Sequence, residues 1–392
     1  MQSLFDRPVP SRIGMESEKW DLMGKGHDPS IVPLSVADME FRSPPQIISA
    51  LEEAARFGMW GYTGWGDRYY NALHNWMRDR HGIEICRDWV VRTNGVIQGI
   101  GAAVRAFTKP GDTILIQPPV YPPFFRCVRE NGRLLAESPL KRTDSGYEMD
   151  FEDLGTQLAR PEVTAMLLCS PHNPVGRVWT RDELTRLAEL CLKNQVLVIS
   201  DEIHCDLVQK DHPHTVFAAL GEEHAHNCVI GGACSKTFSL AGLCCANMLV
   251  PDPVKKQALE AEVFRSGCST YSTFGTVALE VGYEQCAPWV DELLDYIKDN
   301  YECLKDFLSR HFPETWLSPL EGTYLAWIDF AALEPDQEKR ARFLEDDAQL
   351  YLSHGLSYGA PTFERVNLAC TRSVLAAALD RLLAAAQAKG LV

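Results

Sequence analysis

Hydrophobic positions in the middle of the chain follow two alternating patterns. Short apolar runs of strand length lie at 89–92, 112–117, 133–137, 164–169 and 196–200. Between them, apolar residues recur at helical spacing over 96–107, 122–131, 151–159 and 180–193. Continuous apolar strands that alternate with amphipathic helices are typical of an α/β protein, with a mostly parallel sheet covered by helices on both sides.

The two ends of the chain differ from this middle part. Residues 1–45 form an irregular arm rich in proline and glycine, and helical patterns follow at 44–57 and 67–81. Beyond two more strands, at 228–230 and 244–250, the pattern is helical over 253–266, 271–286 and 288–311, and then gives strand 324–329, helix 341–354, strand 365–369 and a last helix from 373. We therefore predict a large domain over 46–285 and a small α+β domain over 286–392, to which the arm 1–45 belongs.

Composition and charge narrow the class of protein. The 392 residues are 46% hydrophobic and 23% charged, as in soluble globular proteins, and no apolar run reaches the roughly 20 residues that span a bilayer. The net charge of −15 argues against nucleic acid and anionic membranes as partners. The first residues lack the basic and apolar regions of a secretory signal, so we expect a cytoplasmic protein.

Cysteine and histidine usage does not indicate a metal site. The 13 cysteines are odd in number, none is spaced as Cys-x-x-Cys, and several lie inside apolar runs, so we interpret them as reduced thiols of the core. Four histidines lie in polar stretches without matching cysteine or carboxylate spacing. We expect solvated loops at these positions, which are His212, His214, His224 and His226.

The stretch 231–242 carries one lysine, Lys236, among small and apolar residues between two predicted strands. A lysine at a strand end in a pocket is harder to charge, because burial disfavours the ammonium form and lowers the pKa. Its neutral amine is a nucleophile that forms a Schiff base with a carbonyl compound. The alternative is an ordinary loop lysine, and the other motifs decide between the two.

Two other strand ends carry features suited to a phosphate and to a flat ring. Gly95 follows the first strand, and Val96 and Ile97 then open a helix, where free N–H groups attract a phosphate. Neither a Gly-x-Gly-x-x-Gly nor a Walker sequence is present, which argues against dinucleotide and nucleoside triphosphate sites. Tyr121 follows the second strand, where its ring either stacks on a flat ligand or fills the core.

The next two strand ends carry polar side chains that need partners. Asn173 precedes a proline, which holds its backbone extended so that the side-chain amide is aimed. Asp201 follows a buried strand, where a carboxylate is costly without a cation such as a protonated ring nitrogen, although it also suits a helix cap. His204 follows closely and is placed to reach the same ligand.

Three motifs together resemble those of fold-type I pyridoxal-phosphate enzymes. They are Ser-Pro-His-Asn-Pro-Val-Gly at 170–176, Ser-Asp-Glu-Ile-His-Cys-Asp at 200–206 and Ser-Lys-Thr-Phe-Ser-Leu-Ala-Gly at 235–242. Within that superfamily of class I and II aminotransferases, the chain looks like the MalY/PatB group of cystathionine β-lyases, with further matching stretches at 5–7, 36–41, 61–63, 326–329 and 365–373. The resemblance implies an aspartate-aminotransferase-like fold, with a mostly parallel seven-stranded sheet in the large domain.

The resemblance also assigns the cofactor contacts. Lys236 would carry pyridoxal 5′-phosphate as an internal aldimine and shuttle protons at the substrate Cα, and Asp201 would pair with the pyridinium nitrogen. Asn173 would bind the ring 3′-oxygen with His204 nearby, and Tyr121 would stack on the ring. The phosphate would rest on groups from several elements, namely the turn at Gly95, the amides of Val96 and Ile97, the hydroxyl of Ser235 and Tyr62 of the neighbouring subunit.

Substrate binding and assembly follow from the same resemblance. Arg365 would clamp the α-carboxylate of a small amino-acid substrate, a bidentate task that suits a guanidinium. The backbone near Ala37 would assist, and Arg372 is the rival clamp. Because Tyr62 would reach across to another subunit, the resemblance implies a homodimer with shared active sites.

The chain departs from the family pattern near the lysine. Ala233 stands where many relatives have a phosphate-binding serine, and Cys244 and Cys245 occupy the region of the usual downstream arginine. Phosphate binding therefore relies more on backbone amides and hydroxyl groups. The loop 357–363, near the expected distal end of the substrate, also looks shorter than the group's pattern.

The activity that the resemblance implies is β-elimination. A carbon–sulfur β-lyase of this kind cleaves L-cystathionine or a related cysteine thioether to a thiol, pyruvate and ammonia. An aminotransferase on the same fold is the alternative, because it uses the same lysine and cofactor and differs in where the proton goes next. A more remote alternative is a cofactor-binding regulatory protein with little turnover.

Overall fold

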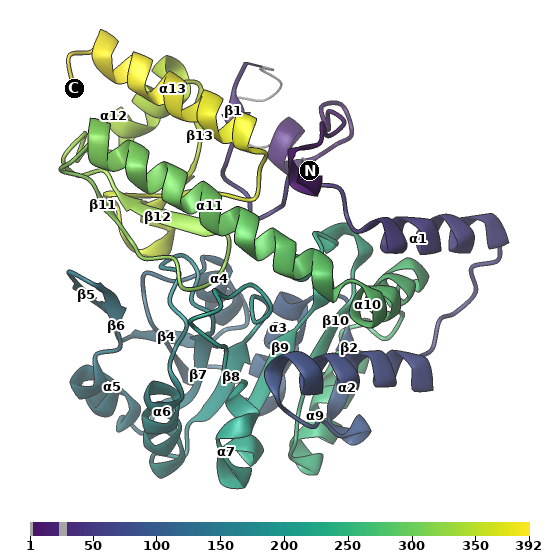
Figure 1. Ribbon diagram of the computed structural model, residues 1–392. Helices are drawn as coiled ribbons and strands as arrows, with labels where there is room; N and C mark the ends of the chain where they lie inside the picture. Colours follow the sequence, from purple (N-terminus) through teal and green to yellow (C-terminus); the bar gives the residue numbers. More distant parts are fainter. Residues whose placement is uncertain (1–2, 23–29) are drawn as a thin grey trace.

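The computed structural model describes residues 3–22 and 30–392. Figure 1 shows two units, one above the other in this view. The lower unit is built round a wide sheet from the middle of the chain, and the upper unit holds a smaller sheet and the C-terminal helices. Helix α10 (Thr273–Gln285) ends and α11 (Ala287–His311) begins close to residue 286, and a domain boundary at that residue stays a prediction.

The wide sheet has seven strands in the order β2-β10-β9-β8-β7-β3-β4. Neighbouring strands run parallel except β10, which is antiparallel to both β2 and β9. The strands are β2 (Val90–Thr93), β3 (Thr113–Ile116), β4 (Leu134–Glu137), β7 (Val163–Cys169), β8 (Leu197–Asp201), β9 (Cys228–Gly232) and β10 (Ala246–Leu249). The predicted α/β fold is confirmed, and every strand but β10 ends at the same edge.

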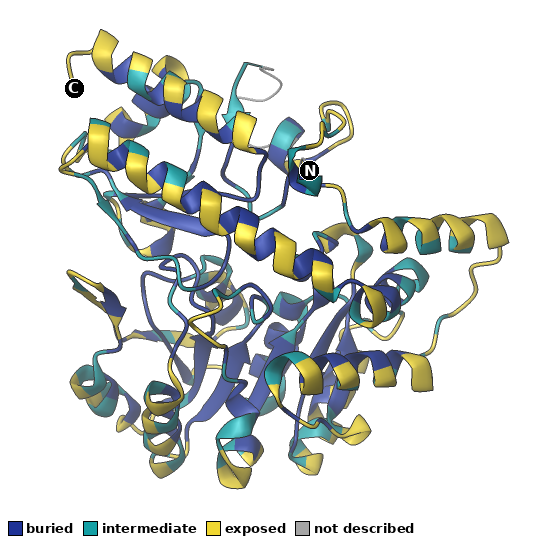
Figure 2. Ribbon diagram, in the orientation of Figure 1, coloured by how far each residue is buried: buried dark blue, intermediate teal, exposed yellow. Residues whose placement is uncertain are grey.

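Helices cover the wide sheet because its strands are apolar on both faces (Figure 2). In β3, Ile114 and Ile116 belong to one buried cluster with Ile100 of α3 (Val96–Phe107), whereas Leu115 belongs to another. This alternation is the two-residue period of a strand buried on both faces. The other helices of this unit are α1 (Pro45–Phe57), α2 (Asp67–His81), α4 (Pro123–Glu130), α5 (Phe151–Leu158), α6 (Arg181–Lys193), α7 (Glu222–His226), α8 (Cys234–Thr237) and α9 (Pro253–Arg265).

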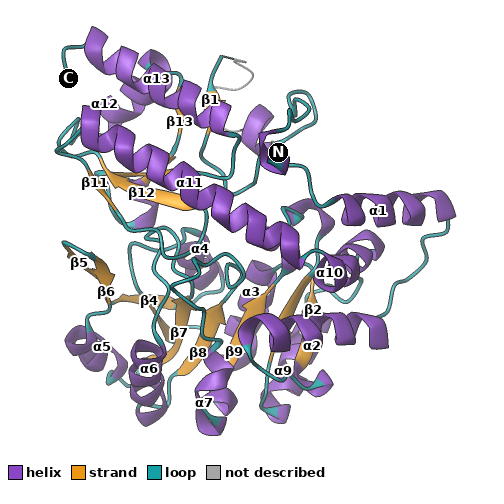
Figure 3. Cartoon of the chain, viewed as in Figure 1, coloured by secondary structure: helices purple, strands orange, loops and turns teal. Residues whose placement is uncertain are grey.

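The upper unit contains a four-stranded antiparallel sheet in the order β11-β12-β15-β14, flanked by helices (Figure 3). Its elements besides α11 are β11 (Trp316–Leu317), β12 (Leu325–Asp329), α12 (Gln337–Arg342), β14 (Ser353–His354), β15 (Phe363–Asn367) and α13 (Arg372–Ala388). The N-terminal arm joins this unit through β1 (Val32–Pro33), which pairs in parallel with β13 (Leu350–Tyr351). Across residues 3–22 and 30–392, no helix is long and apolar enough to cross a membrane.

The predicted helix over 341–354 is wrong in its second half. α12 ends at Arg342, a π turn covers Phe343–Asp347, and the chain then enters β13 and β14. Gln349 has a φ of +54°, a left-handed conformation that interrupts a helix. Leu350 and Leu352 are both buried, so the apolar pattern here has the two-residue period of an extended chain. A hairpin of β5 (Lys141–Thr143) and β6 (Gly146–Glu148) is a further element that the pattern did not predict.

His214 is also placed differently from the expected solvated loop. Its side chain is only 1% exposed, and Nε2 lies 2.9 Å from Oε2 of Glu202, which is itself buried. Glu202 also accepts hydrogen bonds from the Phe217 amide and the Ser200 hydroxyl. The polar stretch around His214 therefore folds inward, because the buried carboxylate of Glu202 needs the hydrogen-bond donors that this stretch supplies.

Candidate active site

A cavity of 790 Å³ lies at the carboxyl ends of the wide sheet. The segments that follow β2, β3, β7, β8 and β9 line it together with the N-terminal arm and the segment 351–358 of the upper unit. Ligands in open α/β sheets bind at this edge, so we take the cavity as the candidate active site. Most of the predicted site residues line it, namely Ala37, Gly95, Val96, Ile97, Tyr121, Asn173, Asp201, His204, Ser235, Lys236 and Arg365.

Lys236 lies in α8, the short helix that begins just after β9. Its Nζ donates a hydrogen bond to the carbonyl oxygen of Ala37 at 2.6 Å. Burial, and then the positive charge of Arg365, lower the pKa of Lys236, although Asp38 and Asp201 act in the opposite direction. The amine therefore loses its proton more readily than an exposed lysine does, as a nucleophile requires.

Asp201 and His204 reach the cavity from the end of β8. Asp201 is 4% exposed, and its Oδ1 accepts a hydrogen bond from the Ile203 amide at 3.2 Å. Burial raises the pKa of Asp201 to about 7, because a buried carboxylate is costly to ionise. Burial lowers the pKa of His204 well below its ordinary value, so the imidazole is neutral, and its Nδ1 is buried without a hydrogen-bond partner among the described residues.

Arg365 extends from β15 toward the end of β7. Its Nη1 donates to Oδ1 of Asn173 at 3.0 Å, and its Nη2 donates to the Ser35 carbonyl at 2.8 Å and to the Ser353 hydroxyl at 3.2 Å. The guanidinium lies over the Tyr358 ring, 5.1 Å from the centroid. Its Nε is buried, with no hydrogen-bond partner in the part of the chain that the structure describes. Three of the five N–H groups of Arg365 make these bonds, so the guanidinium is held in place while the N–H of Nε and one N–H of Nη1 remain for a carboxylate ligand.

Helix α3 begins at the cavity without a capping side chain. Gly95 is its N-cap residue, and a Cβ added at Gly95 would meet nothing within 4 Å. Val96 and Ile97, the first residues of the helix, line the cavity, and so does Ser235 of α8. Uncapped N–H groups at the positive end of a helix dipole favour an anion.

Two predicted site residues do not line the cavity of this chain. Tyr62 is 97% exposed, in the segment between α1 and α2. The guanidinium of Arg372 pairs with Asp299 at 3.3 Å, is 46% exposed, and lies over the Tyr296 ring. The two candidate clamps are therefore separated, and the assignment of Arg372 as an alternative clamp is corrected, because its ion pair lies outside the cavity.

Sequence reasoning missed several residues around the cavity. Tyr324 donates its hydroxyl to the Ala37 carbonyl at 2.9 Å, the same oxygen that accepts from Lys236. Cys245 lines the cavity, and a hydrogen bond from Cys234 lowers the pKa of Cys245 against the effect of burial. No local pattern marks these residues, because only the folded chain brings them together. Further lining residues that were not predicted include Glu18, Ser35, Gln337, Tyr351, Ser353 and His354. Tyr358 also lines the cavity and belongs to the loop 357–363, which was expected near the distal end of the substrate.

The chemistry of the donor set fits pyridoxal 5′-phosphate. The uncapped start of α3 suits the phosphate, and the buried carboxylate of Asp201 suits the cation of a ring nitrogen. Burial raises the pKa of Tyr121 to about 12, so its ring is an uncharged wall of the cavity. The amine of Lys236 suits an aldehyde. Ala233, which stands where many relatives have a phosphate-binding serine, is the N-cap residue of α8 and offers no hydroxyl to a phosphate.

The fold and this donor set define a class of protein. An open, mostly parallel sheet, a small α+β unit and a partly buried lysine just after a strand are the features of fold-type I pyridoxal-phosphate enzymes that the sequence motifs implied. The family model for aminotransferase class I and II matches residues 29–382. The chain belongs to this family.

Particular relatives support the narrower group. The chain is 40% identical to cystathionine β-lyase PatB of Bacillus subtilis, over 95% of this chain and 97% of that protein. It is 33% identical to MalY of Escherichia coli, over 95% and 96%. The crystal structure of cystalysin from Treponema denticola, which contains pyridoxal 5′-phosphate, superposes with a TM-score of 0.96 at 38% identity and covers 99% of this chain and 100% of its own. The predicted resemblance to the MalY/PatB group is confirmed.

Proposed function

We infer that this protein is a pyridoxal-phosphate-dependent carbon–sulfur β-lyase. Its substrate would be L-cystathionine or a related cysteine thioether, and its products a thiol, pyruvate and ammonia. One observation carries the inference: Lys236, Asp201 and Arg365 meet in one cavity, in a chain that matches a cystathionine β-lyase over nearly its whole length.

The geometry supports the cofactor contacts that we propose. The cofactor, when bound, withdraws electrons from the substrate Cα and so makes its proton acidic. Lys236 is the proposed covalent attachment point, and Asp201 holds the positive charge on the ring nitrogen. The side-chain oxygen of Asn173 already accepts from Arg365, so its NH₂ group is the donor left for the ring oxygen. The imidazole of His204 is neutral, and its Nδ1, which has no hydrogen-bond partner among the described residues, is available to the same side of the ligand.

The proposed roles toward the substrate use the remaining groups. Arg365 binds the α-carboxylate and thereby fixes the amino acid in the cavity. Lys236 then accepts the proton from Cα, a step that its lowered pKa favours. The Cβ–S bond breaks, the electron pair leaves with sulfur as a thiolate, and hydrolysis of the remaining fragment gives pyruvate and ammonia.

We also propose a homodimer with shared sites. Tyr62 is 97% exposed, and the nearby Phe57, Met59 and Trp60 are 73%, 75% and 59% exposed. A group of exposed apolar and aromatic side chains in one segment favours burial against another protein surface. A second copy of the chain is the proposed partner, with Tyr62 beside the phosphate site of its neighbour.

The test is a stoichiometric assay of purified protein with pyridoxal phosphate and L-cystathionine, without any keto acid. We expect equal amounts of thiol, pyruvate and ammonia, and none from a Lys236→Ala variant. An amino group that transfers only when a keto acid is added, without pyruvate from the substrate, would make the protein an aminotransferase. Stable cofactor binding with no turnover of either kind would favour the regulatory alternative.

A further inference from the structure

A buried carboxylate, Asp206, contacts the helix that carries Lys236. Its Oδ2 accepts a hydrogen bond from the Thr237 hydroxyl at 2.6 Å, and Thr237 is the residue after Lys236. Its Oδ1 accepts from Trp76 Nε1 at 2.8 Å and lies 2.7 Å from His81 Nε2. The Asp206 side chain is 2% exposed, so these donors replace water as its partners.

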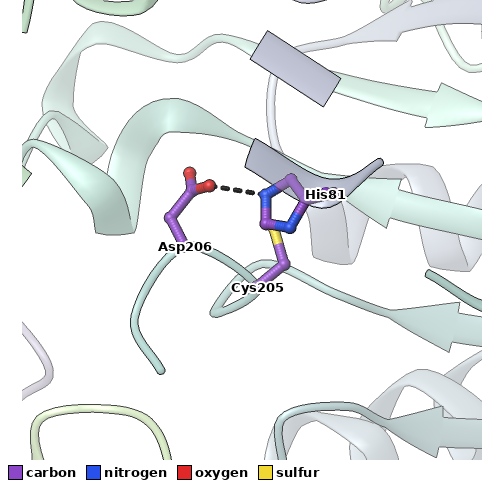
Figure 4. Close-up of side chains that lie close together, drawn as sticks. All are labelled: His81, Cys205 and Asp206. Atoms are coloured by element: carbon purple, nitrogen blue, oxygen red, sulfur yellow. Dashed lines mark hydrogen bonds and ion pairs between the residues drawn. The ribbon is translucent and has the colours of Figure 1, made fainter. Parts of the chain in front are cut away.

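The carboxylate is ionised in this surrounding. Figure 4 shows Asp206 facing the imidazole of His81, with Cys205 next to it. Burial by itself raises the pKa of Asp206, but the hydrogen bonds from His81 and Thr237 and the charge of Arg80 outweigh burial, so the pKa lies below its ordinary value. An ionised carboxylate accepts on both oxygens at once, and its hydrogen bonds are stronger than neutral ones.

The same cluster has the chemistry of a metal site, which the geometry opposes. Ligand atoms of His81, Cys205 and Asp206 lie within 4.8 Å of one another, and zinc accepts all three types. However, both oxygens of Asp206 already accept hydrogen bonds. Nε of Arg80 also lies 3.7 Å from Oδ1 of Asp206, and its positive charge would repel a metal cation. Burial also raises the pKa of Cys205, which disfavours the thiolate that a metal needs. The cluster is therefore better described as a hydrogen-bond network.

This network fixes a helix that cannot hold itself in place. α8 has 4 residues, and its N-cap Ala233 supplies no capping side chain. Helices this short do not form alone, because the entropy cost of ordering the first turn exceeds the free energy gained from its backbone hydrogen bond. Thr237 is fully buried and is the hydroxyl-bearing residue of α8 that contacts Asp206. Through Trp76 and His81, Asp206 ties this turn to α2, which has 15 residues.

We propose that Asp206 is a positioning residue that sets the direction of Lys236 through the hydroxyl of Thr237. The inference rests on the proposed function, in which Lys236 binds the cofactor and moves the Cα proton. Rotation of the α8 turn moves Lys236 and breaks the bond between Thr237 and Asp206, so the bond restrains the amine. Without the restraint, the cofactor still binds but the amine is displaced from its working position, and displacements of about 1 Å cost roughly 100-fold in rate.

Matched variants of Thr237 test the proposal. Thr237→Val removes the hydroxyl and keeps the shape, and Thr237→Ser keeps the hydroxyl. Asp206→Asn tests the acceptor, and Asp291→Asn is the control, because Asp291 pairs with Arg80 at 3.1 Å but is 59% exposed. Three quantities are measured: kcat and KM with L-cystathionine, the pH titration of the visible absorbance of the bound cofactor, and the rate at which apoprotein takes up pyridoxal phosphate.

We expect Thr237→Val to lower kcat roughly 10- to 100-fold with KM little changed, to shift the absorbance titration and to slow cofactor uptake. Thr237→Ser should recover most of the loss, and Asp291→Asn should behave as the wild type. A Thr237→Val protein with unchanged absorbance titration, uptake and kcat would overturn the proposal, and this variant keeps the test decisive if Asp206→Asn fails to fold.

Two controls separate the proposal from its alternatives. Calorimetric titration with ZnCl₂ should show no stoichiometric binding. Binding of one zinc ion that is lost both in Cys205→Ser and in Asp206→Asn would make Asp206 a metal ligand and overturn the positioning role. If pyridoxal phosphate keeps the absorbance of the free compound when the wild-type protein is added, and Lys236→Ala behaves identically, then the proposed function fails, which is distinct from an effect confined to Thr237.

Discussion

The guanidinium of Arg365 donates to the side-chain oxygen of Asn173 at 3.0 Å, although the two residues are 192 positions apart in the chain. Asn173 follows β7 of the wide sheet, and Arg365 lies in β15 of the small one. The contact therefore joins the two units at the cavity. It also orients both side chains, so that the proposed carboxylate clamp and the proposed ring contact depend on each other.

Replacement of this guanidinium tests the clamp. Arg365→Lys keeps the charge but removes the planar fork that contacts Asn173 and Ser35 and that would bind the substrate carboxylate. We expect KM for L-cystathionine to rise roughly 10- to 100-fold, as a loss of about 1.5–3 kcal/mol per charged hydrogen bond implies. Arg372→Lys is the control and should leave KM unchanged. A larger effect at Arg372 would restore it as the clamp.

Asp201→Asn should change how the stability of the apoprotein depends on pH. Folding raises the pKa of Asp201 from 3.8 to about 7, so the folded chain holds a proton that the unfolded chain releases between these values. The stabilising contribution is therefore complete below the unfolded pKa and is lost as pH rises through the folded pKa. At 1.36 kcal/mol per pH unit, the loss is up to roughly 4 kcal/mol.

Urea denaturation of both apoproteins from about pH 5 to 8 measures this effect. The free energy of unfolding of the wild type should fall relative to that of Asp201→Asn over this range. With pyridoxal phosphate bound, the free energy of unfolding of the wild type should instead exceed that of Asp201→Asn at neutral pH, because the cation of the ring nitrogen stabilises the wild-type carboxylate. If the free energies of unfolding of the two apoproteins depend on pH in the same way, then folding does not raise the pKa of Asp201.

Mixed dimers test the shared site. Lys236→Ala and Tyr62→Ala should each have little activity alone. In a mixed dimer, one site combines the intact Lys236 of one subunit with the intact Tyr62 of the other. Random mixing after denaturation and refolding should therefore restore about a quarter of wild-type activity, since half of the dimers are mixed and each has one complete site. Activity that never exceeds that of the two variants alone would place Tyr62 outside the neighbouring site.

A methyl group at Gly231 should disturb the phosphate end of the cavity. A Cβ there would lie 2.7 Å from Cγ1 of Val96, a stiff β-branched side chain at the first position of α3. We expect Gly231→Ala to lower the free energy of unfolding by about 1–3 kcal/mol and to weaken cofactor binding. Gly242→Ala is the matched control, because a Cβ at Gly242 meets nothing within 4 Å. Thermal denaturation and cofactor titration measure both, and equal behaviour of the two variants would contradict this account.

The sequence by itself determined the elements whose patterns are local. Apolar runs such as Val196 to Ser200 predict buried strands because both faces of the sheet are covered, and the residues that follow each run lie at one edge because parallel strands share a direction. The positions of Asn173, Asp201 and Lys236 at the cavity follow from that rule. The motifs at the same positions also identified the family.

The tertiary structure alone decided what depends on distant contacts. The segment after Gln349 is extended because β1 and β15 offer it hydrogen-bonding edges, and propensity cannot reveal such partners. The family resemblance favoured Arg365 over Arg372 as the clamp, and the fold supplies the physical reason, because Arg365 lies on the strand that faces Asn173 and Arg372 lies outside the cavity. The contact of Asp206 with Thr237 spans 31 positions, and although each residue belongs to a motif, neither motif reveals that the two side chains meet. Such pairings form because burial leaves each polar group to find its partner within the folded chain.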